Sequence, residues 1–229
     1  MEIKRDFIFD PSLVLYLPLY ELDGASFMSK DSHGHLCTVT GAVWRPNGRY
    51  FDGVDDYIQI SNPPVTTNQQ GTISVWLNKD ATSRQCFMCY GKPDTASIDA
   101  MRFYIDANDD VYYDVYQSGV NTMCLDSADN VITSGRWHLV TFTSDGSTIK
   151  AYVDGVEKAL TASVGTNTGL WFADVQVEPA DTIVFGGYYR LGALVEDYAG
   201  YIGEIRVYRR ALTPQEVEHN YLATKWRYR

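Results

Sequence analysis

The sequence predicts an all-β protein, folded as a two-sheet antiparallel jelly-roll sandwich with one short C-terminal helix. Three observations support this prediction. About a dozen short strand-like runs are separated by turn signals at regular spacing. Residues 137–160 contain two Asp-Gly turns between such runs, which is typical of an antiparallel meander. A capped helix start at Thr213 directly follows a strand.

The closing strand and helix lie within residues 200–221. Thr213 is a good N-cap, Pro214 takes the first helical position, and Glu216 can close a capping box. Residues 201–208 alternate as expected for a strand with one mostly apolar face and one mixed face. The alternation assigns one face to Tyr201, Gly203, Ile205 and Val207, and the other to Ile202, Glu204, Arg206 and Tyr208.

Two earlier stretches carry the same kind of signal. Asp52-Gly53 is a strong hairpin signal between two strand-like runs. Residues 72–77 alternate strictly, which predicts Ile73, Val75 and Leu77 pointing inward. Trp76 then lies on the opposite face, where packing is the favoured role and a sugar platform is the alternative.

Composition bounds the organisation of the chain. Its 229 residues fit one domain, predicted over 13–229, with 1–12 as an N-terminal arm. The net charge of −10 argues against nucleic acid as the main partner, because phosphate binding needs a basic surface. The first residues carry no apolar run of the signal-peptide type, and Leu13–Leu19 is too short to span a bilayer. The chain as given is therefore intracellular, a mature fragment, or exported by another route.

The four cysteines give no clear metal or redox motif. Cys86 and Cys89 have the C-x-x-C spacing, but Cys37 and Cys124 do not supply a second such pair. Structural or incidental thiols are the favoured interpretation, with a disulfide or a metal as alternatives. Reduced thiols are the default for a chain without a leader peptide.

Four motifs follow one another along the chain. They are Phe51-Asp52-Gly53-Val54-Asp55-Asp56-Tyr57, Gly71-Thr72-Ile73-Ser74-Val75-Trp76, the meander beginning Gly135-Arg136-Trp137-His138, and the closing strand with its Arg210-Ala211-Leu212-Thr213 turn. In this order they resemble the laminin-G-like branch of the concanavalin A-like lectin/glucanase superfamily, over roughly residues 13–223. The resemblance implies a concanavalin A-like fold, a lectin-like function, and an extracellular or virion-surface location.

The resemblance also implies one structural Ca²⁺, for which Asp23 and Asp31 are the candidate ligands. Two departures weaken that site. Residues 31–35 read Asp-Ser-His-Gly-His, and Gly203 stands where the family has an aspartate on its last strand. Calcium prefers six to eight oxygen ligands. His33 and His35 could offer two metal nitrogens, although paired histidines in such a loop are more often exposed polar residues.

The predicted function is a non-catalytic carbohydrate-binding module. The family implies it, and two loop regions hold aromatics that could stack on sugars: Trp171 with Phe172, and Tyr188 with Tyr189. Packing of these rings onto the sandwich is the equally weighted alternative. The expected partner is a glycan or polysaccharide.

An enzyme is not expected. Glycosidases of this fold carry Glu-x-Asp-x-x-Glu on one strand, because retaining hydrolysis needs two close carboxyl groups, and the sequence lacks that spacing. The competing function is a structural, assembly or adhesion protein, such as a virion, tail or surface component. Its arms, Met1–Asp10 and Lys225–Arg229, would bind a neighbouring subunit or another surface protein.

Overall fold

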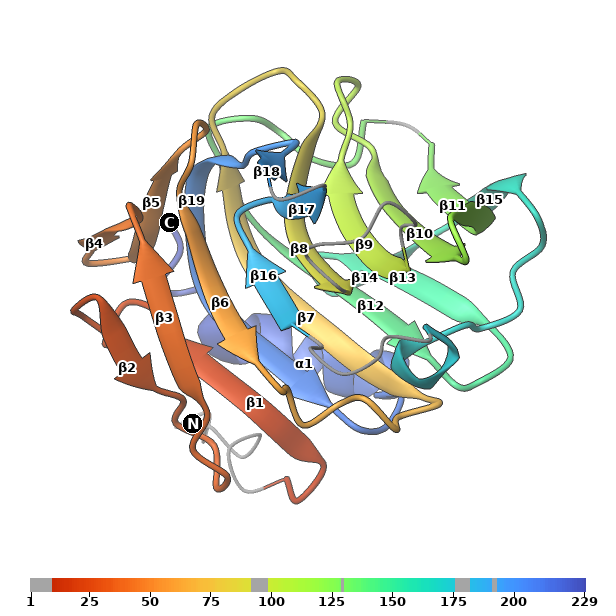
Figure 1. Ribbon diagram of the computed structural model, residues 1–229, viewed down its shortest axis with the longest axis horizontal. Helices are drawn as coiled ribbons and strands as arrows, with labels where there is room; N and C mark the ends of the chain where they lie inside the picture. The colour runs from red at the N-terminus through yellow and green to blue at the C-terminus, as the bar shows by residue number, and fades with distance from the viewer. Residues whose placement is uncertain (1–9, 92–98, 129, 176–181, 191–192) are drawn as a thin grey trace.

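The computed structural model describes residues 10–91, 99–128, 130–175, 182–190 and 193–229, and its two packed antiparallel sheets confirm the predicted sandwich (Figure 1). The eight-stranded sheet has the order β14-β13-β12-β7-β19-β5-β4, with β1 also pairing with β19. Its strands are β1 (Leu13–Pro18), β4 (Val43–Arg45), β5 (Gly48–Asp52), β7 (Gly71–Lys79), β12 (Trp137–Ser144), β13 (Ile149–Val153), β14 (Val156–Lys158) and β19 (Ala199–Tyr208).

The nine-stranded sheet faces the viewer in Figure 1 and has the order β15-β11-β10-β9-β8-β16-β6-β3-β2. Its strands are β2 (Ser26–Met28), β3 (Leu36–Thr40), β6 (Tyr57–Ser61), β8 (Gln85–Gly91), β9 (Ala100–Ile105), β10 (Val111–Gln117), β11 (Val120–Ser127), β15 (Leu160–Val164) and β16 (Thr182–Phe185). The remaining elements are the hairpin β17 (Tyr188–Arg190) and β18 (Ala193–Val195), the 3₁₀ turn η2 (Phe172–Asp174) and the helix α1 (Pro214–Thr224).

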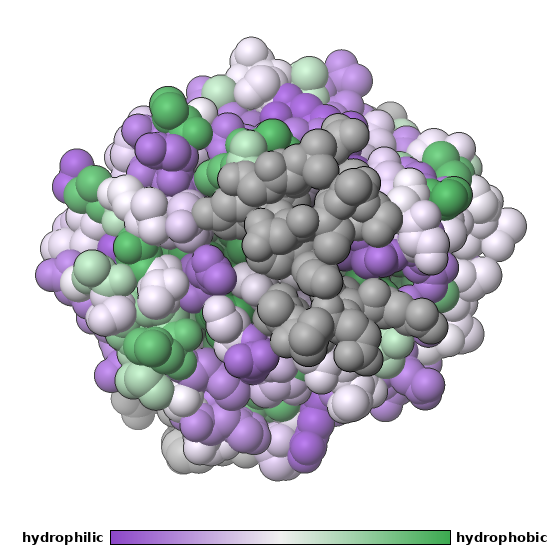
Figure 2. All heavy atoms as spheres, in the orientation of Figure 1, coloured by the Kyte–Doolittle hydropathy of each residue, from purple (hydrophilic) through white to green (hydrophobic). Residues whose placement is uncertain are grey.

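One hydrophobic core fills the space between the sheets. Ile73, Val75 and Leu77 point into it from β7, as their alternation predicts. The meander is also confirmed, since β12, β13 and β14 pair in sequence through the two Asp-Gly turns. No helix among the described residues is long and apolar enough to cross a membrane. On the face seen in Figure 2, hydrophobic residues lie in small groups among hydrophilic ones.

The predicted hairpin at Asp52-Gly53 is wrong. The strands on either side, β5 and β6, belong to different sheets, so this turn carries the chain from one sheet to the other. The Asp56 carboxylate accepts a hydrogen bond of 2.8 Å from the Asp52 amide, which closes the turn. An Asp-Gly pair favours a tight turn, but it does not determine whether the two flanking strands pair with each other. Here each of them pairs with other strands, in different sheets.

The prediction of which residues of the last strand share a face is wrong for the start of β19. A β-bulge between Ile202 and Ile205 shifts the register of β19 against β7, so both isoleucines point into the core. Gly203 sits in this bulge, and a Cβ there would come within 2.6 Å of the Tyr228 ring. The Glu204 amide donates a hydrogen bond of 2.8 Å to the Tyr228 hydroxyl. The bulge therefore needs glycine because the C-terminal tail occupies the space.

The outer face of the eight-stranded sheet is covered by α1 and the C-terminal tail, behind the sheets in Figure 1. Trp76 is 1 % exposed there, stacks on Tyr228 at 4.3 Å and donates a hydrogen bond to Thr224 on α1. This confirms the packing role expected for Trp76. Beneath the same cover, Arg206 forms a buried ion pair with Glu204.

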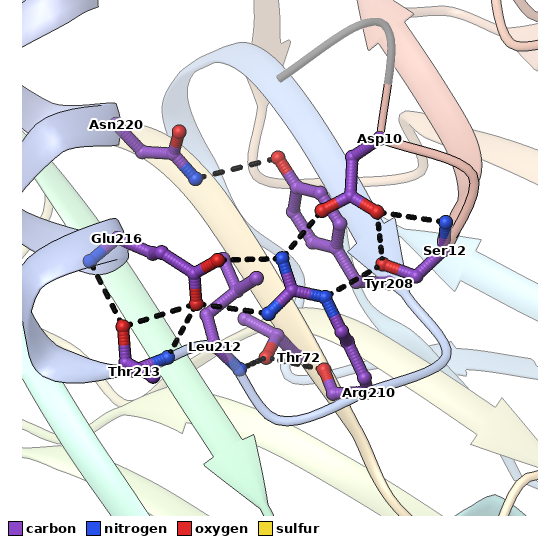
Figure 3. Close-up of polar contacts among 9 residues, drawn as sticks. All are labelled: Asp10, Ser12, Thr72, Tyr208, Arg210, Leu212, Thr213, Glu216 and Asn220. Carbon is purple, nitrogen blue, oxygen red and sulfur yellow. Dashed lines mark hydrogen bonds and ion pairs between the residues drawn. The ribbon is translucent and has the colours of Figure 1, made fainter. Parts of the chain in front are cut away.

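Arg210 ties the start of β1 to the start of α1 (Figure 3). Its guanidinium donates to Asp10 at 2.5 Å, to Ser12 at 3.1 Å and to both Glu216 oxygens at 2.7 and 2.8 Å. Glu216 also closes the capping box with Thr213, as the sequence predicts. Residues 10–12 of the predicted arm are therefore held against the domain, and 1–9 lie outside the described residues.

This contact predicts a pH-dependent contribution to stability. Hydrogen bonds from Arg210 lower the pKa of Glu216 from 4.5 to about 2. The stabilisation is thus complete above the unfolded-state pKa and is lost as the pH falls towards 2. We expect Arg210→Met to lower the free energy of unfolding at pH 7, with a difference from wild type that shrinks below pH 4.5. Urea unfolding at several pH values measures this.

The matched control is Arg209→Met, because the Arg209 side chain is exposed and the residue's contact with Ser12 is made by its backbone amide. This variant should follow the wild type at every pH. A stability loss in Arg210→Met that stayed constant from pH 7 to pH 2 would show that the ion pair is not its cause.

Candidate functional site

The two aromatics of the 171–172 insertion lie in the core. Trp171 and Phe172 are both fully buried, and the Trp171 ring packs among Phe103, Tyr113 and Phe172 at centroid distances of 5.5–6.1 Å. Neither ring offers a face to a ligand, so the structure contradicts their prediction as a sugar platform. The packing alternative describes them correctly.

Tyr188 is also unsuited to stacking on a sugar. It is 4 % exposed, and its ring lies 4.6 Å from the guanidinium of Arg102. Arg102 forms a bidentate pair with Asp114 on the neighbouring strand, at 2.9 and 2.5 Å, and both side chains are buried. Tyr189 lies in β17, but its side chain is outside the described part of the structure.

A different set of residues forms a cleft of about 340 Å³ on the outer face of the eight-stranded sheet. It lies where the β4–β5 turn, the end of β7, the start of β12 and the start of β19 meet. Trp137 and Tyr201 are half-buried, with ring centroids 6.0 Å apart and planes tilted by 51°. Clefts of this size bind small ligands when aromatic walls are combined with a few polar groups. The lining residues are Arg45, Pro46, Asn47, Asn78, Trp137 and Tyr201.

Strand pairing builds the cleft. Asn78 on β7 pairs with Trp137 on one side and with Tyr201 on the other, and Tyr201 pairs in turn with Tyr50 on β5. These four residues form one row across four adjacent strands, and residues in such a row point to the same face. Tyr50 supports Tyr201 edge-on at 5.0 Å. The row therefore fixes an amide between two aromatic rings.

The side-chain carbonyl of Asn78 lacks a partner. Its Oδ1 is buried and accepts no hydrogen bond from any described residue. An unpaired buried carbonyl costs roughly 1–3 kcal/mol. Because Oδ1 itself is closed to solvent, a ligand hydroxyl gains this much by donating to it only when the half-buried Asn78 amide turns toward the cleft. Arg45 and Asn47 are exposed at the rim and add charge-assisted and amide hydrogen bonding. The cleft thus has the groups that bind polyhydroxylated rings: aromatic walls, amides and a guanidinium.

The sequence contains a weak signal for this cleft. Trp137 and Tyr201 each lie at or near the first position of a strand, where a side chain is only half covered by neighbours. Their approach depends on the register of β12, β7 and β19, which are far apart in the chain. Periodicity within one strand cannot reveal such a row.

Asp23 and Asp31, the residues expected to bind Ca²⁺, do not share a cluster of three potential metal ligands among the described residues. The exposed Asp23 carboxylate accepts a hydrogen bond from Gly24, whereas Asp31 lies with His33 and His35. Among the described residues, the other potential metal cluster is Asp52, Asp55 and Asp56, and Asp23 belongs to neither cluster. Two imidazoles beside Asp31 do not suit calcium, which prefers oxygen donors. The donor set therefore does not fit the metal implied by the family.

The chain belongs to the concanavalin A-like lectin/glucanases superfamily, since that family's model matches residues 52–218. This confirms the resemblance carried by the four sequence motifs. The search of curated proteins finds no match.

Solved structures share the fold at low sequence identity. The Ruminococcus gnavus IT-sialidase CBM40 bound to α2,3-sialyllactose has a TM-score of 0.59 and 19 % identity, covering 67 % of this chain and 83 % of that one. Its complex with α2,6-sialyllactose has a TM-score of 0.58 and 19 % identity, covering 67 % and 84 %. Trypanosoma rangeli sialidase has a TM-score of 0.66 and 17 % identity, covering 94 % of this chain but only 33 % of that one.

The burial of Trp171 yields a direct prediction. We expect Trp171→Ala to lower the free energy of unfolding by about 3–5 kcal/mol, because a large core side chain leaves a cavity. Denaturant unfolding measures this. Trp226→Ala is the control, since Trp226 is 53 % exposed, and it should cost less than about 1 kcal/mol. Equal, small effects of the two substitutions would contradict the core position of Trp171.

Proposed function

We propose that the protein is a non-catalytic glycan-binding module and that the cleft between Trp137 and Tyr201 holds the sugar. The observation that carries this proposal is the Asn78 carbonyl, which is buried without a partner among the described residues and lies between two aromatic rings. A pyranose can stack its apolar face on Trp137 or Tyr201 while a hydroxyl donates to Asn78 Oδ1, once the amide has turned toward the cleft. Burial of the sugar's apolar face and the hydrogen bond to the Asn78 carbonyl then both stabilise the bound sugar.

The comparisons support the same class of ligand. CBM40 structures with this fold are bound to α2,3- and α2,6-sialyllactose. Arg45 at the rim of the cleft is suited to a carboxylated sugar, because guanidinium binds carboxylate in a fork geometry. We therefore propose acidic oligosaccharides as the preferred ligands. A glycan-binding role also fits an extracellular or surface location.

The non-catalytic assignment rests on the state of the three buried carboxylates of the described residues. Asp114 is bound to Arg102, and Glu204 is bound to Arg206 and to the hydroxyls of Tyr16 and Tyr20. Asp56 accepts the hydrogen bond from the Asp52 amide that closes the β5–β6 turn. Carboxylates engaged in this way are poorly placed to act as a nucleophile and an acid on one bond. The assembly alternative has no support from the similar structures named above.

The decisive substitution is Asn78→Ala. We expect titration with α2,3-sialyllactose to show at least a tenfold loss of affinity, corresponding to about 1.4 kcal/mol for one hydrogen bond to the sugar. Thermal stability should be unchanged or slightly higher, because the substitution removes an unpaired buried carbonyl.

Lactose, which lacks the carboxylate, should bind more weakly than sialyllactose to the wild type, and Arg45→Ala should remove that difference.

Asn121→Ala is the matched control. Asn121 also has a buried, unpaired Oδ1, but it lies on β11 of the other sheet. It should bind sialyllactose like the wild type. Loss of binding in Asn121→Ala with retention in Asn78→Ala would move the glycan site to the nine-stranded sheet and overturn the assignment of the cleft.

A further inference from the structure

A second site lies in the loop that joins β2 to β3. Asp31, His33 and His35 each offer one potential ligand atom, and these atoms lie within 4.8 Å of one another. His33 Nδ1 is 3.6 Å and His35 Nε2 is 3.7 Å from Asp31 Oδ1. We propose that this loop binds a first-row transition metal ion of the Zn²⁺ type.

The distances from Asp31 Oδ1 to the two histidine nitrogens suit such an ion. Zinc binds histidine nitrogen and carboxylate oxygen at about 2.0–2.2 Å, so neighbouring ligands around a tetrahedral ion are roughly 3.4 Å apart. The two separations from Asp31 Oδ1 are only slightly longer than this value. Small movements of two imidazole rings therefore complete the coordination of three ligands, and water supplies the fourth.

The loop holds the aspartate in place without a metal. Asp31 Oδ2 accepts a hydrogen bond of 3.1 Å from the Tyr16 amide on β1. Oδ1 accepts two, one of 2.8 Å from the His33 amide and one of 3.2 Å from the Gly34 amide. The loop ends are joined by Ser29, whose amide donates to the His35 carbonyl and whose hydroxyl accepts from the His35 amide. Partners of this kind orient a ligand before the metal arrives.

His35 retains capacity for a metal, and His33 Nδ1 has only a long contact of 3.4 Å with the Ser32 hydroxyl to give up. His35 Nε2 is buried and makes no hydrogen bond with any described residue. An imidazole nitrogen that has lost water without gaining a partner is stabilised by a cation. His33 is exposed and leaves the site open to solvent on one side, which provides an entry path. The imidazoles that make the loop unsuitable for calcium are the donors that transition metals prefer.

The test is titration of the full chain, free of any polyhistidine tag, with ZnCl₂ by calorimetry, and with Co²⁺ followed by visible absorption. We expect one Zn²⁺ per chain, tetrahedral-type Co²⁺ bands displaced by Zn²⁺, and a higher melting temperature with the metal. His33→Ala and His35→Ala should each weaken Zn²⁺ binding at least tenfold. Ca²⁺ should neither compete nor raise the melting temperature.

His219→Ala is the matched control, because His219 is exposed on α1 and belongs to neither metal cluster of the described residues. It should bind Zn²⁺ like the wild type. Absence of Zn²⁺ binding, or binding that is unchanged in both loop variants, would overturn the proposal. If His35→Ala does not fold, Zn²⁺ binding by His33→Ala, which changes an exposed side chain, still tests the proposal. Sialyllactose binding by the wild type tests the cleft separately.

Discussion

The β-bulge at Gly203 sets the arrangement of the eight-stranded sheet. Strand β19 pairs with β1, β5 and β7, so an irregularity in it affects three neighbours at once. Before the bulge Tyr201 points outward into the cleft, and after it Glu204 and Arg206 point outward under the C-terminal tail. Between them, Ile202 and Ile205 both enter the core. A regular strand would place either the cleft or the ion pair on the wrong face.

The bulge also makes the C-terminal tail part of the sheet's outer layer. Tyr228 fills the space left by the missing Cβ of Gly203, accepts a hydrogen bond from the Glu204 amide and stacks on Trp76. The buried Glu204–Arg206 pair therefore exists only under this cover. A buried pair gains from mutual attraction while water is excluded, and removing one partner leaves an uncompensated charge. The C-terminal tail, the glycine at position 203 and the Glu204–Arg206 ion pair thus depend on one another.

The sequence was sufficient for the fold class, the alternation of residues 72–77, the meander and the helix cap at Thr213, because these depend on local periodicity and capping chemistry. It misassigned the Asp52-Gly53 turn, because that turn joins strands of different sheets. Trp171 and Tyr188 lie in regions that looked like exposed loops, yet their rings are buried. The cleft was not predicted, since the row from Trp137 to Tyr201 depends on pairing between distant strands.

The position of β19 also constrains how the chain folds as it is synthesised. Strands β1, β5 and β7 are made early, but each keeps one edge unpaired until residues 199–208 of β19 are made. Until then the middle of the sheet is a gap bordered by unpaired strand edges, which are prone to associate with other chains. High contact order of this kind slows folding. Emergence of the closing strand is therefore the point at which the nascent chain passes from a collection of hairpins to a cooperative domain.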